Sequence, residues 1–471
     1  MSNHILETAF QNGIENTGFL NTMLPEISFE LFEAYRLKNT ELLWVNKALL
    51  SKYGIKGTKD EIEQFLLDEY SYVSLDYASS NRLDADDQKI FLADRYGSRH
   101  EVCHGGSARC GFDGCFQIKG IGLTPLLAQN MSKSHSHGKL FIDEAISEAI
   151  WGEVCHKHLP FGAIRTLAII KTNIKEAFLY SDNRPMKSCA LVIREFAIRP
   201  AHFERSTFFW PSRDNIHLRD NDADRVKEAI SFLPNVLKLT ELEISCGKIL
   251  FQCLKKMILS IAKQIAYSRV KGIPHGSLTS SNISVDGRFL DFGTITAVPD
   301  FGNYVLSNGV GAVWDDHQLI LNWLQSIFDT LNKYTSYEAK VSLNEMEILK
   351  KIFINEMDRQ ENISLLEELN VKNIKSSDLE KAKLVKNRLM SPHRMTLGHF
   401  NDDAFKVMVK KIALDVGLDI GEIKFELRSF RYSSFTILNN TILDNKEYSK
   451  ESVSTLICLL YTSDAADDKA R

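Results

Sequence analysis

The segment His275–Gly293 constrains the fold more than any other part of the chain. It reads His-Gly-Ser-Leu-Thr-Ser-Ser-Asn-Ile-Ser-Val-Asp-Gly-Arg-Phe-Leu-Asp-Phe-Gly, which predicts a short loop, a strand, a tight turn at Asp286-Gly287 and a second strand. Such a hairpin places Asn282 and Asp291 side by side at its two ends. Both side chains offer the hard oxygen ligands that Mg²⁺ prefers. The segment therefore predicts a magnesium site formed by Asn282 and Asp291.

Composition allows a large folded chain and argues against several classes of partner. The 471 residues are 44% hydrophobic, which suffices for one large or two ordinary domains. A formal net charge of −4 argues against nucleic acid as a partner. The start lacks a signal-peptide pattern and no stretch of about 18 apolar residues occurs, so we expect a cytoplasmic protein without a membrane span. The eight scattered cysteines favour reduced thiols.

Hydrophobic periodicity and turn residues predict a mixed chain that becomes mainly helical after about residue 335. Residues 95–127 are rich in glycine turns. The expected strands are Cys115–Lys119, Thr166–Thr172 and Cys189–Arg194, and the expected helices are Ile142–His156, about Lys238 to Ser268, and Trp314–Phe328.

The last fourteen residues, Cys458–Arg471, look like the translation of a transposon-end sequencing adapter. We therefore expect them not to be native, and they carry no weight in the interpretation of fold or function.

Four separated segments together resemble one known family. They are Phe116–Pro125, which contains Gln-Ile-Lys-Gly-Ile-Gly-Leu-Thr-Pro, then Ile146-Ser-Glu148, then Leu191–Glu204, and finally His275–Gly293. In this order they are similar to motifs of selenoprotein O, the YdiU family of kinase-like adenylyltransferases, over about residues 95–330. The Thr-Ser-Ser-Asn form of the last loop is most similar to the MchC-type microcin maturation proteins within that family.

The resemblance implies an α/β (α+β) fold of the two-lobe protein-kinase-like type, with a helical C-terminal region. The expected divisions are an N-terminal mixed region (1–90), a nucleotide-binding region similar to an N-lobe (91–235), a C-lobe with the catalytic-type loop and metal hairpin (236–335), a helical region (336–457) and the adapter-like tail (458–471).

The resemblance also implies roles for individual residues toward ATP and Mg²⁺, or Mn²⁺. Lys119, held by Glu148, would contact the phosphates. Arg194 and Arg199 would bind the outer phosphates, because in this family ATP lies opposite to its orientation in protein kinases. Gly105, Gly106 and Arg109 loosely resemble the family's Gly-Asp-Gly-Arg-Ala loop, whose backbone could cradle phosphate.

Ser281 stands where the family has a catalytic Asp, and a neutral serine cannot take up a proton without its own base. Three interpretations remain open. Positioning and Mg²⁺ alone sustain the chemistry, a neighbour such as His275 replaces the base, or the domain binds ATP without turning it over.

Other patterns have simpler alternatives. Arg194 and Arg199 could form ordinary ion pairs with Glu195 or Glu204, and Lys119 and Glu148 could be unrelated surface residues. Zinc is a weak alternative for the cysteines near Cys110, because their spacing is not Cys-x-x-Cys.

The leading functional hypothesis is ATP- and Mg²⁺-dependent transfer of AMP to hydroxyl groups of a protein or peptide acceptor, as the resemblance implies. The alternative is a microcin maturation factor. It would bind ATP as a pseudokinase, without catalysis or only with an acyltransferase-like partner, and assist siderophore attachment to a microcin precursor.

Overall fold

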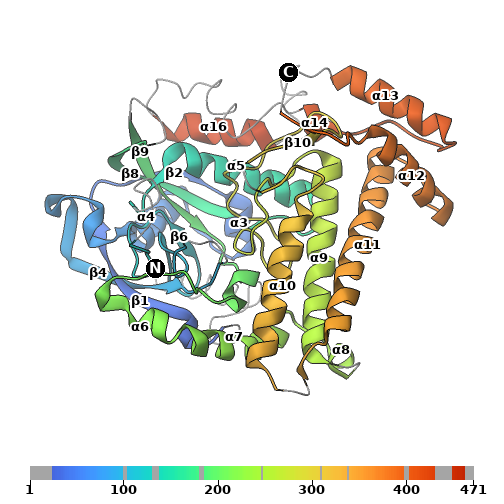
Figure 1. Ribbon diagram of the computed structural model, residues 1–471. Helices are drawn as coiled ribbons and strands as arrows, with labels where there is room; N and C mark the ends of the chain where they lie inside the picture. Colours follow the sequence, from blue (N-terminus) through green and yellow to red (C-terminus); the bar gives the residue numbers. More distant parts are fainter. Residues whose placement is uncertain are drawn as a thin grey trace.

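The computed structural model describes residues 24–98, 103–129, 137–179, 185–245, 248–307, 310–336, 339–396, 402–429 and 448–461. A sheet-containing part occupies one side of the molecule and a group of long helices the other (Figure 1). The expected mixed α/β class with a helical C-terminal region is confirmed. None of the helices in the described ranges is both long and apolar enough to cross a membrane.

One antiparallel sheet of nine strands joins the N-terminal region to the predicted nucleotide-binding region. Its order is β2-β8-β9-β6-β5-β4-β1-β3, and β7 also pairs with β9. The strands are β1 (Phe29–Leu37), β2 (Glu41–Val45), β3 (Tyr72–Val73), β4 (Leu83–Asp94), β5 (Cys110–Phe112), β6 (Gln117–Lys119), β7 (Leu140–Phe141), β8 (Thr166–Ala177) and β9 (Met186–Arg194). Because β4 runs through residue 90, the sheet is continuous across the boundary expected there.

Both faces of the sheet are buried. Along β9, Ala190 and Val192 join one apolar cluster, whereas Leu191 and Ile193 join the other, as the two-residue period of a strand requires. Helices α3 (Lys47–Lys52) and α4 (Lys59–Tyr70) contribute to the second cluster.

Helix α5 (Ile142–His158) covers the first face, where it packs against β8 and β9. Its first turn is acidic and its last turn is basic, which suits the helix dipole. It begins at the predicted residue and extends two residues beyond the predicted end.

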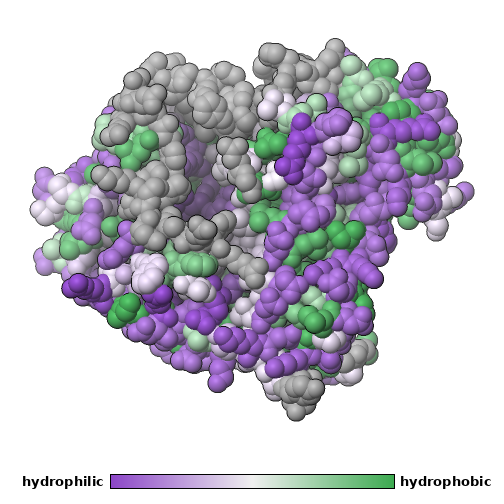
Figure 2. Space-filling model, viewed as in Figure 1, coloured by the Kyte–Doolittle hydropathy of each residue, from purple (hydrophilic) through white to green (hydrophobic). Residues whose placement is uncertain are grey.

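The remaining helices are α6 (His217–Asp220), α7 (Asp222–Val236), α8 (Glu241–Ser245), α9 (Ile249–Lys271), α10 (His317–Tyr334), α11 (Leu343–Glu368), α12 (Ser376–Leu389), α13 (Asp402–Asp415), α14 (Glu426–Ser429) and α16 (Lys450–Tyr461). Most of them lie on the other side of the molecule, but α6 lies near β1 and α16 packs against α5 and β2 (Figure 1). Helices α9, α10 and α11 run side by side (Figure 1). Hydrophilic residues cover most of the visible surface of this part, interrupted by hydrophobic patches (Figure 2). Strands β10 (Asn303–Tyr304) and β11 (Arg394–Met395) form a short parallel pair.

The prediction of one helix from about Lys238 to Ser268 is confirmed only from Ile249 onward, because Lys248, with a ψ of 114°, precedes the first turn of α9 and α8 is separate. Lys238 has a φ of 49°, and Thr240 and Glu243 form a reciprocal capping box that starts the separate helix α8. Helix α9 then ends at Lys271, followed by Gly272 with a φ of 81°. The chain passes directly from this turn into the loop at His275.

Candidate functional site

Lys119 and Glu148 form a buried ion pair between the sheet and α5. Lys119 pairs with Val192 in the register of β6 and β9, so its side chain lies on the face that α5 covers. Its Nζ contacts Glu148 Oε1, and both side chains are less than a tenth exposed. The alternative of two unrelated surface residues is therefore wrong.

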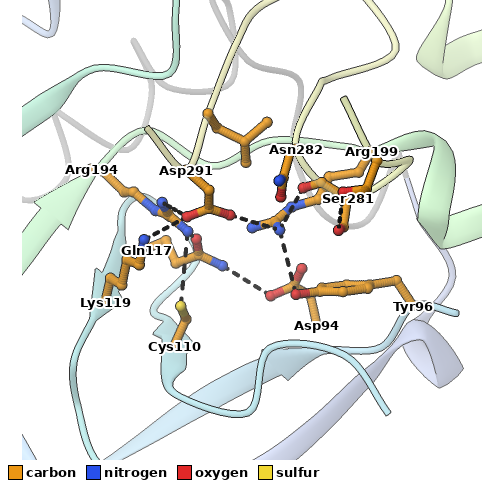
Figure 3. A network of polar contacts seen from close by, with 12 residues as sticks. Asp94, Tyr96, Cys110, Gln117, Lys119, Arg194, Arg199, Ser281, Asn282 and Asp291 are labelled. Atoms are coloured by element: carbon orange, nitrogen blue, oxygen red, sulfur yellow. Dashed lines mark hydrogen bonds and ion pairs between the residues drawn. The ribbon is translucent and has the colours of Figure 1, made fainter. Parts of the chain in front are cut away.

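Asp291 is the point on which the basic residues converge (Figure 3). Its Oδ1 lies 2.5 Å from Lys119 Nζ and 3.1 Å from Arg194 Nη1, and its Oδ2 lies 3.4 Å from Arg199 Nη1. Burial alone would raise the pKa of this carboxyl, but the three cations together hold it well below the usual range. Asp291 has a φ of 60°, a conformation that residues other than glycine rarely adopt.

Arg194 and Arg199 approach this carboxylate from different elements. Arg194 ends β9, and Arg199 precedes the short 3₁₀ helix at Pro200–Phe203. The ion pairs recorded for these two arginines in the described part of the chain are with Asp291 and, for Arg194, Glu148, rather than with Glu195 or Glu204. Glu195 instead contacts Lys52, Tyr53 and Arg288, and Glu204 accepts a hydrogen bond from Ser280.

The segment Asn282–Asp291 folds as a tight hairpin but not as two regular strands. Ile283 and Phe289 form a single antiparallel bridge, and Gly287 has a φ of 92° at the turn. The amide of Leu290 donates to Asn282 O at 3.2 Å. The hairpin thus places Asn282 beside Leu290, the residue that precedes Asp291.

The donor set at the hairpin fits a magnesium ion that shares its coordination with phosphate. Asn282 Nδ2 donates to Ser277 O at 3.0 Å, so its Oδ1 faces away and accepts no hydrogen bond from any described residue. Together with the Asp291 carboxylate this makes two hard oxygen ligands, and Mg²⁺ commonly takes the rest from water and phosphate. No group of three or more His, Cys, Asp or Glu side chains able to hold a metal occurs in the described parts of the chain.

Among the described residues, no base lies beside Ser281. Its hydroxyl contacts Thr279 Oγ1 at 3.0 Å, its carbonyl accepts from Arg199 Nη1 at 2.9 Å, and no carboxylate of the described chain lies within hydrogen-bonding distance of the hydroxyl. His275 does not replace the base. It is fully buried, its Nε2–H donates to Leu290 O at 2.9 Å, and its Nδ1 accepts from Ser277 N at 3.3 Å. Its ring thus anchors the loop.

The glycines at 105 and 106 have a clear packing role. The Gly105 amide donates to Leu126 O at 2.9 Å, and a Cβ here would lie 2.4 Å from the Phe209 ring. Gly106 has a φ of 147° and packs against the end of β4. Arg109 contacts Lys139 O and Glu144. Phosphate binding by this loop stays a prediction, and the engaged amide of Gly105 does not favour it.

Four residues of the network escaped the sequence analysis: Asp94, Tyr96, Gln117 and His202 (Asp94, Tyr96 and Gln117 are labelled in Figure 3). Only Gln117 had a usable signal. It lies two positions before Lys119 on a strand, so both side chains share one face of the sheet.

Comparison with known proteins links this geometry to one family. A family model described as protein adenylyltransferase SelO matches residues 106–319. The protein nucleotidyltransferase YdiU of Shewanella loihica (strain ATCC BAA-1088 / PV-4) is 25% identical over 194 residues, which cover 41% of this chain and 35% of the relative. The YdiU protein of Shewanella oneidensis (strain ATCC 700550 / JCM 31522 / CIP 106686 / LMG 19005 / NCIMB 14063 / MR-1) is 24% identical over 192 residues, with the same shares.

The chain therefore spans about a third of the length of these curated relatives, 35% in each case. The matched stretch contains Lys119, Glu148, both arginines and the Asn282–Asp291 hairpin. It is similar to a SelO-type domain, and the expected kinase-like fold class is confirmed. The narrower likeness to MchC-type proteins stays a prediction.

Proposed function

We propose that this protein transfers AMP from ATP to a hydroxyl group of a protein or peptide, with Mg²⁺ or Mn²⁺ as cofactor. The observation that carries the proposal is the convergence of Lys119, Arg194 and Arg199 on Asp291, beside the free oxygen of Asn282. Three fixed cations beside a pair of hard oxygen ligands suit a metal-bound triphosphate. The match to a protein adenylyltransferase model supports transfer of a nucleotide rather than of a phosphate.

Each residue has a distinct role in this proposal. Lys119, held by Glu148, and the two arginines bind phosphate oxygens and stabilise the pyrophosphate that leaves. Asn282 and Asp291 hold the metal ion, which neutralises charge on the phosphates when it is bound. The acceptor oxygen forms a bond to the α-phosphorus as the bond to the β-phosphate oxygen breaks. Since no described residue offers a base to the Ser281 hydroxyl, the acceptor proton leaves to water or to a group on the acceptor.

The second candidate is a partner-dependent maturation factor that acts in the cytoplasm. The absence of a carboxylate near the Ser281 hydroxyl among the described residues favours it, because general-base catalysis typically contributes about 10²–10⁴ to a rate. In this version the domain binds ATP, and an acyltransferase-like partner completes the site during siderophore attachment to a microcin precursor.

Labelling with two forms of ATP separates the candidates. Purified full-length protein is incubated with Mg²⁺ or Mn²⁺ and either α-³²P-ATP or γ-³²P-ATP, and Asp291→Ala serves as the control. AMP transfer predicts label from the α-phosphate only, lost in the variant. Measurable ATP binding without label from either form would favour the partner-dependent role. ATP binding that is unchanged in Asp291→Ala would contradict the metal site.

A further inference from the structure

A buried chain of hydrogen bonds links the two arginines through the sheet. Asp94, at the end of β4, accepts from Gln117 Nε2 at 2.9 Å through Oδ1 and from His202 Nε2 at 3.2 Å through Oδ2. Gln117 Oε1 accepts from Arg194 Nε at 3.0 Å. His202 Nδ1 accepts from the Arg199 amide at 2.9 Å. One carboxylate thus connects the side chain of one arginine with the backbone of the other.

The partners in this hydrogen-bond network determine which atom donates and which accepts in each bond. His202 Nδ1 lies near both the Arg199 amide and Arg199 O, at 2.9 and 3.2 Å. Because the Asp94 carboxylate at Nε2 can only accept, the single proton of the neutral imidazole lies on Nε2, and Nδ1 accepts from the amide. Burial, which lowers the pKa of His202, keeps the ring neutral. Gln117 must likewise turn its oxygen to Arg194 and its NH₂ group to Asp94. Within this network, the Asp94 carboxylate is the group that accepts hydrogen bonds from both sides, from Gln117 and from His202.

The chain lies where water cannot replace a lost partner. Asp94 and His202 are 0% exposed and Gln117 is 2% exposed. Removal of a buried partner is therefore not compensated by solvent. The register of β6 and β9 sets Gln117 opposite Arg194, so their contact follows from strand pairing.

We propose that Asp94 is a positioning residue that orients Arg194 and Arg199 together for the phosphates of the nucleotide; this rests on the proposed function. Arginine side chains have many rotamers, and holding them before the ligand arrives avoids an entropy loss on binding. Arg199 Nε has no hydrogen-bond partner in the described chain, so its orientation depends on its backbone, its Nη1 contacts and the ring of Tyr96, 4.9 Å away. The backbone is the part that His202 holds.

Asp94→Asn tests this directly because it changes one acceptor into a donor at constant size. The new NH₂ group faces an N–H of either Gln117 or His202. A flipped Gln117 amide would then point its own NH₂ at Arg194 Nε–H. The other His202 tautomer would lose the bond from the Arg199 amide and donate from Nδ1 to Arg199 O instead, 3.2 Å away. The first rearrangement leaves Arg194 Nε without its acceptor, and the second exchanges the bond that holds the Arg199 amide for a longer one to its carbonyl.

The experiment compares the affinities of the full-length protein for Mg²⁺–ATP and for adenosine, which lacks phosphates, by titration calorimetry. Asp94→Asn should weaken ATP binding by about 10- to 100-fold and change adenosine binding by no more than about twofold. Gln117→Met is a second variant that breaks only the branch to Arg194, and it should weaken ATP binding by about tenfold.

Thr172→Val is the matched control. Thr172 is buried in the same sheet and donates to Cys189 O at 3.0 Å, remote from the arginines in the hydrogen-bond network. It should lower the unfolding temperature and leave the preference for ATP over adenosine unchanged. The inference is overturned if folded Asp94→Asn and Gln117→Met keep the wild-type preference, or if Thr172→Val loses as much of it. A wild-type protein without any preference for ATP would instead contradict the proposed function.

Discussion

Lys119 Nζ lies 2.5 Å from Asp291 Oδ1, although the two residues are 172 positions apart in the chain. The contact joins β6 to the end of the hairpin, and Figure 3 shows the two side chains facing each other. Since Arg194 and Arg199 also contact this carboxylate, its negative charge is already matched by cations. This arrangement favours a metal ion that arrives with phosphate over one that arrives alone, because phosphate gives the cations another partner.

Metal binding should therefore depend on nucleotide. Mn²⁺ titrated into the protein alone should bind at least about tenfold more weakly than in the presence of ATP, because three nearby cations repel it. Electron paramagnetic resonance of free Mn²⁺ measures both affinities. Asp291→Asn should lose the ATP-dependent component. Equally tight binding with and without ATP, sensitive to this substitution, would contradict the expectation.

A carboxylate at position 281 should restore a base. If transfer to a hydroxyl is limited by proton removal, Ser281→Asp should raise the rate of α-label incorporation by about 10²-fold or more. Ser281→Asn is the control, since it has similar size without a charge. Equal rates in the two variants would show that proton removal does not limit the reaction.

Trp323 on α10 should support the loop that carries Asn282. Its indole N–H donates to Leu278 O at 3.1 Å. Trp323→Phe should lower the unfolding free energy by about 1–3 kcal/mol and also weaken Mg²⁺–ATP binding, because the loop loses a hydrogen bond.

The control for that variant is Trp314→Phe. Trp314 is also buried and donates from its indole to Phe301 O at 3.0 Å, away from the loop. It should lose similar stability but keep its affinity for Mg²⁺–ATP, as judged by urea unfolding and calorimetry. Equal losses of affinity in both variants would show that the effect is general destabilisation.

The free energy of unfolding should decrease as the pH is lowered through the mildly acidic range. Burial lowers the pKa of His202 and of His275 below that of an exposed histidine. As pH falls below about 6.5, the unfolded chain takes up protons at these positions while the folded chain does not. The unfolding free energy should therefore be level above about pH 7.5 and decline below 6.5, by up to about 1.4 kcal/mol per pH unit for each histidine.

Urea unfolding between pH 5.5 and 8 measures this dependence. His275→Gln should remove the contribution of one histidine. The slope of the unfolding free energy against pH below 6.5 should therefore decrease by the amount that corresponds to about one proton. An unchanged slope in this variant would mean that His275 is not held neutral.

Much of the candidate site could be predicted from local sequence patterns, because its turns and strands are each formed by a short stretch of the chain. The Asp286-Gly287 turn brings Asn282 next to the residue before Asp291, and the strand at Lys119 precedes a helix whose face holds Glu148. The same patterns left a base role for His275 open, because its ring nitrogens are engaged by Leu290 and Ser277 only when the hairpin closes over it. Whether the gathered residues act on a nucleotide stays a proposal.

By itself, the sequence determined which side chains bring charge and metal-binding oxygens, and which short turns and strands carry them. Only the tertiary structure decided that Arg194 and Arg199 pair with Asp291 rather than with Glu195 or Glu204, and that Asp94 links them. The reason is that ion pairs and buried hydrogen bonds depend on distance through space. That distance follows from sheet order and strand register across the whole chain, which local spacing does not contain.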